Sequence, residues 1–339
     1  MARVLVTGGC GFVGRHLVKA LQDRGDEIRV VDLAPPSVGG PHAEYIRGSI
    51  TDAALMDSAL KGVDRVYHLA GIPHLWAKKR SGFDIANRQG TEAVMAACMR
   101  ANVPRVVHCS TESILLPKTK REAVDESLTL QLGDMPGPYT RSKFQAEVAA
   151  MKAAREGLNV TIVNPTVPVG AGDDNMTPPA QMLALFLKGG TPFFLDCVLN
   201  LVDVRDAADG MILAGDKGAV GERYILGGEN VRLRDLLRLL EEVSGRRMPT
   251  RTILPPIALA AGVVSEFIAN NITRTAPAAT LEGILLALRS GAFDNSKARR
   301  ELGYSPRPVD TALRAELEWL ASRNNAEQPT SFGHEASAK

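Results

Sequence analysis

Tyr139 and Lys143 are the two residues whose types and spacing suggest chemistry most directly. A helical pattern opens near Tyr139 and continues to about residue 156, so side chains four residues apart share one face and can reach the same site. An ammonium group near a phenol favours the phenolate and lowers the pKa of tyrosine from its ordinary value of about 10. Tyr139 could then exchange protons near neutral pH. The same spacing also occurs in an ordinary amphipathic helix with an exposed lysine and a half-buried tyrosine.

Thr111 is a third candidate, because it follows a predicted strand over residues 106–110. Its hydroxyl would lie just past the carboxyl end of that strand, where it could hydrogen-bond a substrate oxygen beside Tyr139. The alternative is a turn residue that caps the segment beginning at Glu112. A glycine-rich turn that could bind a dinucleotide precedes all three residues along the chain. The turn and these residues follow predicted elements in the order expected if they share one site, and this favours the catalytic interpretation.

That motif is a glycine-rich turn between the first predicted strand, residues 3–6, and a helix that opens at Phe12. Gly9, Gly11 and Gly14 allow a tight turn, close approach of a diphosphate and close packing of helix on strand. The turn also points backbone N–H groups and the positive end of the helix dipole at the phosphates. Alternatively, the glycines merely let a helix pack on a sheet.

Asp32 ends the second predicted strand, residues 28–31, at the expected distance after the glycine motif. A carboxylate there accepts hydrogen bonds from both ribose hydroxyls and repels a 2′-phosphate. No arginine follows within residues 33–36, so NAD is the expected cofactor rather than NADP. Arg29 or Arg47 could still approach from elsewhere in the fold.

Strand and helix patterns alternate through the first half of the chain, which predicts right-handed crossovers and a parallel sheet. Further strands are expected over residues 44–47, 65–71 and 160–163, and a helix over 87–101; Asp52 would cap another helix. The fold class is therefore α/β, a doubly wound parallel sheet of the Rossmann type with a smaller C-terminal substrate lobe. Ligands should bind at the carboxyl ends of the strands.

The alternation breaks after residue 165, where prolines and glycines predict an irregular segment. A helix over 181–187 follows, and a strand over 199–202 with the helix near Asp206 should return to the sheet. Helices over 233–243, 257–269 and 309–320 would form the smaller lobe. We therefore expect a dinucleotide-binding domain from residues 1–165 and about 199–227. Residues 166–198 and 228–322 would form the substrate lobe, and 323–339 a disordered tail.

Composition excludes several classes of protein. The formal charge of +2 is too balanced to indicate a nucleic-acid partner. The four cysteines are scattered, with no spacing for a metal site or a disulfide framework, and reduced thiols are the simpler interpretation. No signal peptide is expected before the first strand, and no apolar run is expected to reach transmembrane length. We expect a soluble, cytoplasmic protein without a bound metal.

Five segments together resemble an extended short-chain dehydrogenase/reductase of the NAD-dependent epimerase/dehydratase family, over roughly residues 1–320. They are Thr7-Gly8-x-x-Gly11-x-x-Gly14, His68-Leu69-Ala70-Gly71, Asn87-x-x-Gly90-Thr91, Ser110-Thr111 and Tyr139-x-x-x-Lys143. The segments 201–206, 221–230 and 301–304 resemble a narrower branch that includes hopanoid-associated sugar-epimerase-like proteins, dihydroflavonol reductases and 3β-hydroxysteroid dehydrogenases.

The resemblance implies a role for each matched residue. Tyr139 would be the acid/base, Lys143 its partner and a ligand of the nicotinamide ribose, and Thr111 the donor to the substrate oxygen. Further cofactor contacts are implied for Gly8, Gly11, Phe12, Val13, Gly14, Asp32, Ser49, Ile50, Leu69, Ala70, Gly71, Asn87 and Pro165. One departure is Ser49-Ile50, where relatives often have Asp-Ile, so a hydroxyl replaces the carboxylate that would contact the adenine amine.

The substrate expectation comes from the segment between Glu156 and Val204, which would supply much of the variable lobe. It contains one basic residue, Lys188, and five acids, so a nucleotide-sugar diphosphate would fit poorly. Apolar residues from Met182 to Leu195, and the helix beginning at Pro255, could face an apolar substrate or could simply form the core of the lobe. His74 and Trp76 would lie near the substrate entrance, where they could pack against the lobe or contact the substrate, whereas the patterns around His68 and His108 indicate core residues.

We therefore expect an NAD(H)-dependent oxidoreductase that interconverts a secondary alcohol and a ketone on a largely apolar, lipid-like substrate. The alternative is a nucleotide-sugar epimerase or dehydratase with transient oxidation by bound NAD. A non-catalytic protein that senses the dinucleotide is a third hypothesis, disfavoured by the presence of Tyr139, Lys143 and Thr111. Contact with a membrane surface and a homodimer are the partner expectations left open.

Overall fold

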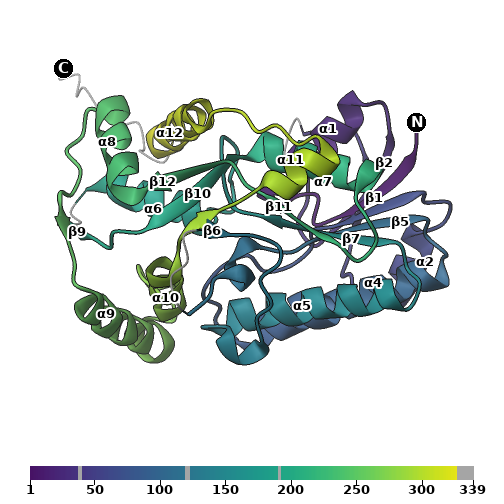
Figure 1. Ribbon diagram of the computed structural model, residues 1–339, viewed down its shortest axis with the longest axis horizontal. Coiled ribbons are helices and arrows are strands. Elements are labelled where there is room, and N and C mark those ends of the chain that lie inside the picture. Colours follow the sequence, from purple (N-terminus) through teal and green to yellow (C-terminus); the bar gives the residue numbers. More distant parts are fainter. Residues whose placement is uncertain (37–39, 119–122, 190–191, 327–339) are drawn as a thin grey trace, which may run out of the picture.

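The computed structural model describes residues 1–36, 40–118, 123–189 and 192–326. Within these residues, parallel strands form a central seven-stranded sheet in the order β11-β7-β5-β4-β1-β2-β3 (Figure 1). The strands are β1 (Arg3–Thr7), β2 (Glu27–Asp32), β3 (Glu44–Arg47), β4 (Arg65–His68), β5 (Arg105–Cys109), β7 (Val160–Pro165) and β11 (Arg223–Leu226). The chain moves outward from β1 to β3 and then returns to β4 on the other side of β1. This is the doubly wound Rossmann arrangement, and the expected fold class is confirmed.

Helices cover both faces of this sheet (Figure 1). One face is covered by α1 (Phe12–Asp23), α7 (Val204–Lys217) and α11 (Ser296–Leu302). The other is covered by α2 (Ala53–Ala59), α4 (Gly90–Arg100) and α5 (Pro138–Arg155). The apolar side of α1 is fully buried at Leu17, Val18 and Leu21, as its periodicity predicts. Asp52 caps α2, because its side chain accepts from the backbone N–H of Leu55 at 3.1 Å.

Short elements connect the layers of the larger domain. They are the turn of helix α3 (Ser81–Phe83), the π-helix η1 (Asp84–Gln89), the 3-10 turns η2 (Glu112–Leu115) and η3 (Leu132–Asp134), and the paired strands β6 (Ala123–Val124) and β14 (Ala292–Phe293). The helix predicted over residues 87–101 is therefore divided, and its first residues belong to η1.

The smaller lobe is built on a second sheet in the order β12-β10-β8. Its strands are β8 (Val167–Val169), β10 (Val198–Asp203) and β12 (Glu229–Arg232), and β9 (Phe193–Phe194) pairs with β13 (Arg251–Thr252). Two expectations were wrong here. Residues 165–179 are not wholly irregular, because β8 lies within them. The strand predicted over 199–202 does not return to the main sheet, since β10 pairs with β8 and β12 while β11 occupies the place beside β7.

Helices complete the lobe. They are α6 (Pro178–Lys188), α8 (Leu233–Ser244), α9 (Pro255–Ile268) with the π-turn η4 (Ala269–Thr273), α10 (Leu281–Arg289) and α12 (Val309–Ala326). α6, α8 and α12 pack around a separate apolar core, whereas α9 lies against α10 at the edge of the molecule (Figure 1). Because α12 continues to Ala326, the first residues of the expected disordered tail are helical. Residues 327–339 of that tail lie outside the described part of the chain.

One expectation about composition was also wrong. The helical segment Pro255–Thr273, 19 residues of α9 and η4, is long and apolar enough to cross a membrane by length and composition, and only 17% of it is buried. The length of this apolar helix is hard to recognise from the sequence, because Ser265, Glu266 and Asn270 interrupt the apolar run.

Candidate functional site

The turn between β1 and α1 has the backbone that a diphosphate requires. Gly8 has φ +75°, and a Cβ added there would lie 2.6 Å from the backbone nitrogen of Ala70 at the end of β4. A Cβ at Gly14 would collide with the carbonyl oxygen of Gly8. Gly11 begins α1 without any side-chain acceptor for the first N–H groups of the helix. Those N–H groups therefore remain available for an anion, and the residues present fit the dinucleotide.

Asp32 lies at the carboxyl end of β2, beside this turn. Its two carboxylate oxygens accept from the backbone N–H of Cys10 at 2.9 Å and of Ala34 at 3.0 Å. A small pocket of about 130 Å³ lies here, and Arg47 also lines it. Arg29 is engaged elsewhere, with Glu44 at 2.7 Å. Arg47 is therefore the arginine that lies near the position where NADP would carry its 2′-phosphate and NAD would not.

The strand end after β4 is held tightly against β1. The N–H of Leu69 donates to the carbonyl of Thr7, and the N–H of Ala70 lies 3.4 Å from the Thr7 hydroxyl. A Cβ on Gly71 would lie 2.6 Å from the amide oxygen of Asn87. That amide is buried and also donates to the Ser142 hydroxyl at 2.8 Å. Asn87 thus ties the strand end to α5.

The other predicted cofactor residues make protein contacts. Phe12 is buried, with its ring edge-on to His16, and Val13 is half-buried against the core. The Ser49 hydroxyl bonds that of Thr51 at 2.7 Å. Ile50 is buried near Gly90, and Pro165 is buried at the end of β7, paired with Leu226.

Thr111, Tyr139 and Lys143 meet at the carboxyl end of β5. Thr111 directly follows the strand, and Tyr139 lies in the first turn of α5, where the Thr111 side chain is close enough to lower the pKa of its phenol. Lys143, one turn further along α5, donates from Nζ to the carbonyl of Cys109 at 2.7 Å. The sequence-predicted trio is therefore brought together, with Thr111 and Lys143 both tied to one strand end.

The pKa of Tyr139 is shifted in the direction opposite to the expected one. Burial raises the pKa of the phenol above its ordinary value, and the negative charge of Glu112 raises it further. Burial also lowers the pKa of Lys143, whose ammonium is directed at the Cys109 carbonyl. The expectation that Lys143 lowers the tyrosine pKa is thus wrong for this structure, because desolvation and a carboxylate dominate.

Glu112 is a buried carboxylate that the sequence interpretation treated only as part of a turn. Its two oxygens accept from the Thr111 hydroxyl at 2.9 Å and the Ser113 hydroxyl at 3.2 Å, and burial raises its pKa. Thr111 in turn accepts from the N–H of Ser113 at 3.3 Å. Thr111 is therefore both the cap of η2 and a neighbour of Tyr139, so the two interpretations are compatible.

A second buried hydrogen-bond network, centred on Asn164 and Glu147, contacts the Thr111 segment. Asn164, at the end of β7, donates to the carbonyl of Thr111 at 3.1 Å and to Glu147 at 3.0 Å. Glu147 also pairs with Arg223 of β11 at 2.7 Å. Tyr139, Lys143 and Glu147 are spaced four residues apart, and this continued spacing is the sequence signal that could have identified Glu147.

Glu282 of α10 caps the helix that bears Tyr139. Its carboxylate accepts from the N–H groups of Tyr139 at 3.1 Å and Thr140 at 2.7 Å, and from the Thr140 hydroxyl at 2.7 Å. Negative charge at a helix N-terminus is favourable, although burial raises the pKa of this carboxyl. A separation of 143 residues left no local signal for this contact.

His68 and His108 are buried, as expected of core residues. His68 is buried and bonds the hydroxyls of Thr7 at 2.7 Å and Thr91 at 3.0 Å, and burial lowers its pKa to about 3. His108 is also buried, and neither of its ring nitrogens has a partner among the described residues. Trp76 donates from Nε1 to Asn270 of η4 at 3.0 Å. His74 is half-buried, which lowers its pKa.

The apolar side chains of the variable segment largely form the lobe's own core. Leu183, Phe186 and Phe194 are buried together with residues of α8 and α12. Arginines from other elements reach this segment: Arg15 pairs with Asp174 at 2.6 Å, Arg205 with Asp203 at 2.5 Å and Arg234 with Asp196 at 3.2 Å. Arg246 donates to the carbonyl of Leu187 at 2.6 Å.

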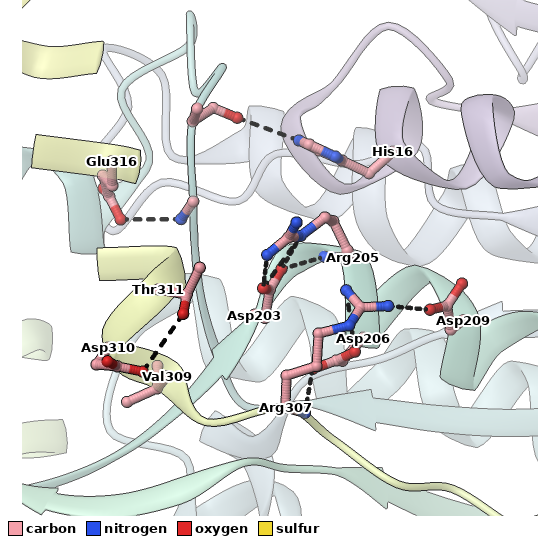
Figure 2. A network of polar contacts seen from close by, with 12 residues as sticks. His16, Asp203, Arg205, Asp206, Asp209, Arg307, Val309, Asp310, Thr311 and Glu316 are labelled. Atoms are coloured by element: carbon pink, nitrogen blue, oxygen red, sulfur yellow. Dashed lines mark hydrogen bonds and ion pairs between the residues drawn. The ribbon is translucent and has the colours of Figure 1, made fainter. Parts of the chain in front are cut away.

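Figure 2 shows how the segment around β10 and α7 joins the two parts of the molecule. Asp203 caps α7 and pairs with Arg205, whereas Asp206 accepts from the backbone N–H of Arg307 at 2.6 Å. His16 of α1 bonds the carbonyl of Ala171 at 3.1 Å. The motif over residues 201–206 therefore has a structural role in this fold.

Comparison with known proteins gives the family. The model of the NAD dependent epimerase/dehydratase family matches residues 4–227. This chain belongs to that family. It is 32% identical to a putative dihydroflavonol 4-reductase of Synechocystis, covering 93% of each chain. It is 30% identical to sterol demethylase protein B of Methylococcus capsulatus, covering 94% of this chain and 98% of that one.

The solved structure of gox2253 has a TM-score of 0.82 and 32% identity, covering 95% of this chain and 99% of that chain. The resemblance to an extended short-chain dehydrogenase/reductase is thus confirmed, as is NAD as the cofactor of the family. The protein is an enzyme of this NAD-dependent family.

Proposed function

We propose that this enzyme interconverts a secondary alcohol and a ketone on an uncharged, largely apolar substrate, with net oxidation or reduction. In the oxidising direction the carbinol carbon loses a hydride, the hydroxyl loses a proton, and the C–O single bond becomes a double bond. NAD, when bound, supplies the hydride acceptor at C4 of nicotinamide. It would be held by the Gly8–Gly14 turn, Asp32 and Lys143.

The chain's own residues account for the proton and for orientation. As the phenolate, Tyr139 takes the hydroxyl proton from the alcohol; as the phenol, it returns that proton to the ketone oxygen. The Thr111 hydroxyl lies beside the phenol and positions the same oxygen. Burial of both groups excludes water and strengthens their interaction with the developing charge.

The observation that carries the substrate class is that the arginines reaching residues 156–204 from α1 and α7 are already paired with carboxylates. Between Glu156 and Val204 the only basic residue is Lys188, and the arginines that reach this segment from α1 and α7 are engaged by Asp174 and Asp203. A substrate diphosphate would have to displace those carboxylates, at the cost of leaving buried Asp203 unpaired. The names of the reductase and sterol-demethylase relatives agree with an apolar ketone or alcohol.

The test is a screen of lipid ketones and alcohols, including sterol-like compounds and keto-sphingolipids, beside UDP-sugars. NADH absorbance and product stereochemistry are followed with the wild-type enzyme and with Tyr139→Phe. An apolar substrate should give a stoichiometric absorbance change, because its oxidised and reduced forms both leave the enzyme. The alternative, a nucleotide-sugar epimerase, regenerates its cofactor in each cycle. Epimer formation from a UDP-sugar without an NADH signal would replace our proposal with that alternative.

A further inference from the structure

The outer face of α9 and η4 is an exposed apolar surface. Six large side chains project from it with exposed fractions between 40% and 70%: Ile257, Val263, Val264, Phe267, Ile268 and Ile272. Soluble monomers rarely expose so many apolar side chains on one continuous helix, and such patches usually mark an interaction surface. Figure 1 places α9 at the periphery of the lobe, where α10 is its neighbour.

The inner face of the same helix is specifically anchored. Ala258 and Gly262 are buried, and the missing side chain at Gly262 allows close approach of Ile284 of α10. Glu266 accepts from the backbone N–H of Leu281 at 2.8 Å. Asn270 accepts from Trp76 at 3.0 Å. The fold therefore fixes which face is exposed, and these polar anchors would be lost if the helix left the lobe to span a bilayer.

Charge around the patch is one-sided. From Thr252 to Thr273 the only charged residue is Glu266, which is turned inward and lies 3.6 Å from Arg80. Arg251 and Arg274 flank the helical segment, and Lys78 and Lys79 adjoin Arg80 in the loop that Trp76 attaches to η4. These four cations are exposed, and none has a carboxylate partner among the described residues.

An apolar face bordered by unpaired cations matches the boundary between acyl chains and anionic headgroups. It matches a second copy of this chain less well, because a two-fold contact through the patch would bring the same cations together. We propose that the outer face of α9 and η4 docks this enzyme on the surface of an anionic membrane. The helix would lie in the plane of the interface, with its inner face still packed on α10.

This docking surface lies one helix away from the catalytic residues. α10 packs on α9 and also carries Glu282, which binds the first turn of α5 beside Tyr139. Docking would therefore hold the active-site side of the lobe close to the lipid phase. The inference concerns the surface alone and does not depend on the substrate.

The experiment is co-flotation of the full-length protein with vesicles of phosphatidylcholine alone, or with about a third of the lipid replaced by phosphatidylglycerol. Val264→Glu places a charge on the exposed face, and Val220→Glu is the matched control, since both valines are more than half exposed and Val220 lies between α7 and β11. The double variant Lys78→Glu/Lys79→Glu tests the charge requirement. NAD binding and thermal unfolding establish that each variant is folded.

The wild-type protein should float with anionic vesicles, and Val220→Glu should float equally well. Val264→Glu should reduce binding about tenfold or more, and the double variant Lys78→Glu/Lys79→Glu should reduce it at least about fivefold. Absence of wild-type flotation, or unchanged flotation of Val264→Glu, would overturn the proposal. So would light scattering that shows a dimer dispersed by Val264→Glu without any vesicle binding, since the patch would then be an interface between two copies.

Discussion

Burial and the nearby Glu112 carboxylate raise the pKa of the Tyr139 phenol, so the phenol keeps its proton near neutral pH. The hydroxyl is therefore the group whose removal should affect catalysis most directly. Tyr139→Phe should lower turnover at least about a hundredfold, because the hydroxyl that exchanges the proton is lost. NAD affinity, measured by isothermal titration, should change little. Tyr304→Phe is the control, since the Tyr304 hydroxyl is buried in the core and has no hydrogen-bond partner among the described residues. If Tyr139→Phe kept most of the wild-type rate, the acid/base assignment would be wrong.

Glu112 allows us to predict the direction in which the pKa of Tyr139 can be shifted. Its negative charge raises the pKa of Tyr139, so Glu112→Gln should lower that pKa. Alcohol oxidation requires the deprotonated Tyr139, so the limb on which the rate rises with pH should move to lower pH, by about one unit for a single nearby charge. A pH–rate profile of kcat measures the shift. Glu126→Gln is the control, because the half-buried Glu126 carboxyl accepts from the backbone N–H of Ile225. It should leave the pH–rate profile unchanged. An equal shift in this variant would show that the effect on the Tyr139 pKa is not specific to Glu112.

Asp32 decides the cofactor preference at the same scale. Titration with NAD⁺ and NADP⁺ should show tighter NAD⁺ binding in the wild-type enzyme, because the carboxylate repels a 2′-phosphate. Asp32→Ala should narrow the difference, and Arg47 in the adjacent pocket is placed to favour NADP⁺ once the acid is gone. Equal or tighter NADP⁺ binding by the wild-type protein would contradict the prediction.

At the scale of elements, the position of α5 depends on α10. Glu282→Ala would leave two buried N–H groups and a hydroxyl in the first turn of α5 without their acceptor. We expect a loss of about 2 kcal/mol or more in the free energy of unfolding by urea, together with lower turnover. Glu282→Gln retains an acceptor oxygen and should lose less on both measurements. Equal effects of the two substitutions would mean that side-chain volume, not capping, is what matters.

At the scale of the whole molecule, α12 is fastened to the loop after β8 through a buried carboxyl. Glu316 accepts from the N–H of Gly170 at 3.1 Å (Figure 2), and burial raises its pKa to about 8, with a further contribution from Asp173. The folded protein therefore retains a proton that the unfolded chain releases above its ordinary pKa of 4.5. This contribution to stability is complete below about pH 4.5 and is lost as the pH rises toward 8.

Glu316→Gln should remove that dependence. The stability of the variant relative to the wild-type protein should increase across this window by up to about 1.4 kcal/mol for each pH unit, and then level off. Urea unfolding of both proteins from about pH 5 to about pH 9 measures the difference. A constant difference across the range would show that Glu316 does not titrate on unfolding.

The sequence by itself determined the features that follow from local physics. Strand–helix alternation predicts the parallel sheet, the glycine turn at residues 8–14 predicts an anion site, and helical spacing puts Tyr139 and Lys143 on one face. Each depends on residues a few positions apart, where periodicity and backbone conformation act directly. The sequence analysis does not predict α10, although Thr280 is a typical helix cap. Gly283 interrupts its apolar pattern, so the helix has no clear boundary in the sequence.

Only the tertiary structure decided the environment of those residues. The chain separation between Glu282 and Tyr139, or between Asn164 and Thr111, leaves no periodic signal, yet both contacts are buried and hold the site. The partner of β10 was likewise chosen by packing in the lobe rather than by its own sequence. Burial also reversed the expected direction of the Tyr139 pKa, because desolvation depends on everything that surrounds a group and not on its neighbours along the chain.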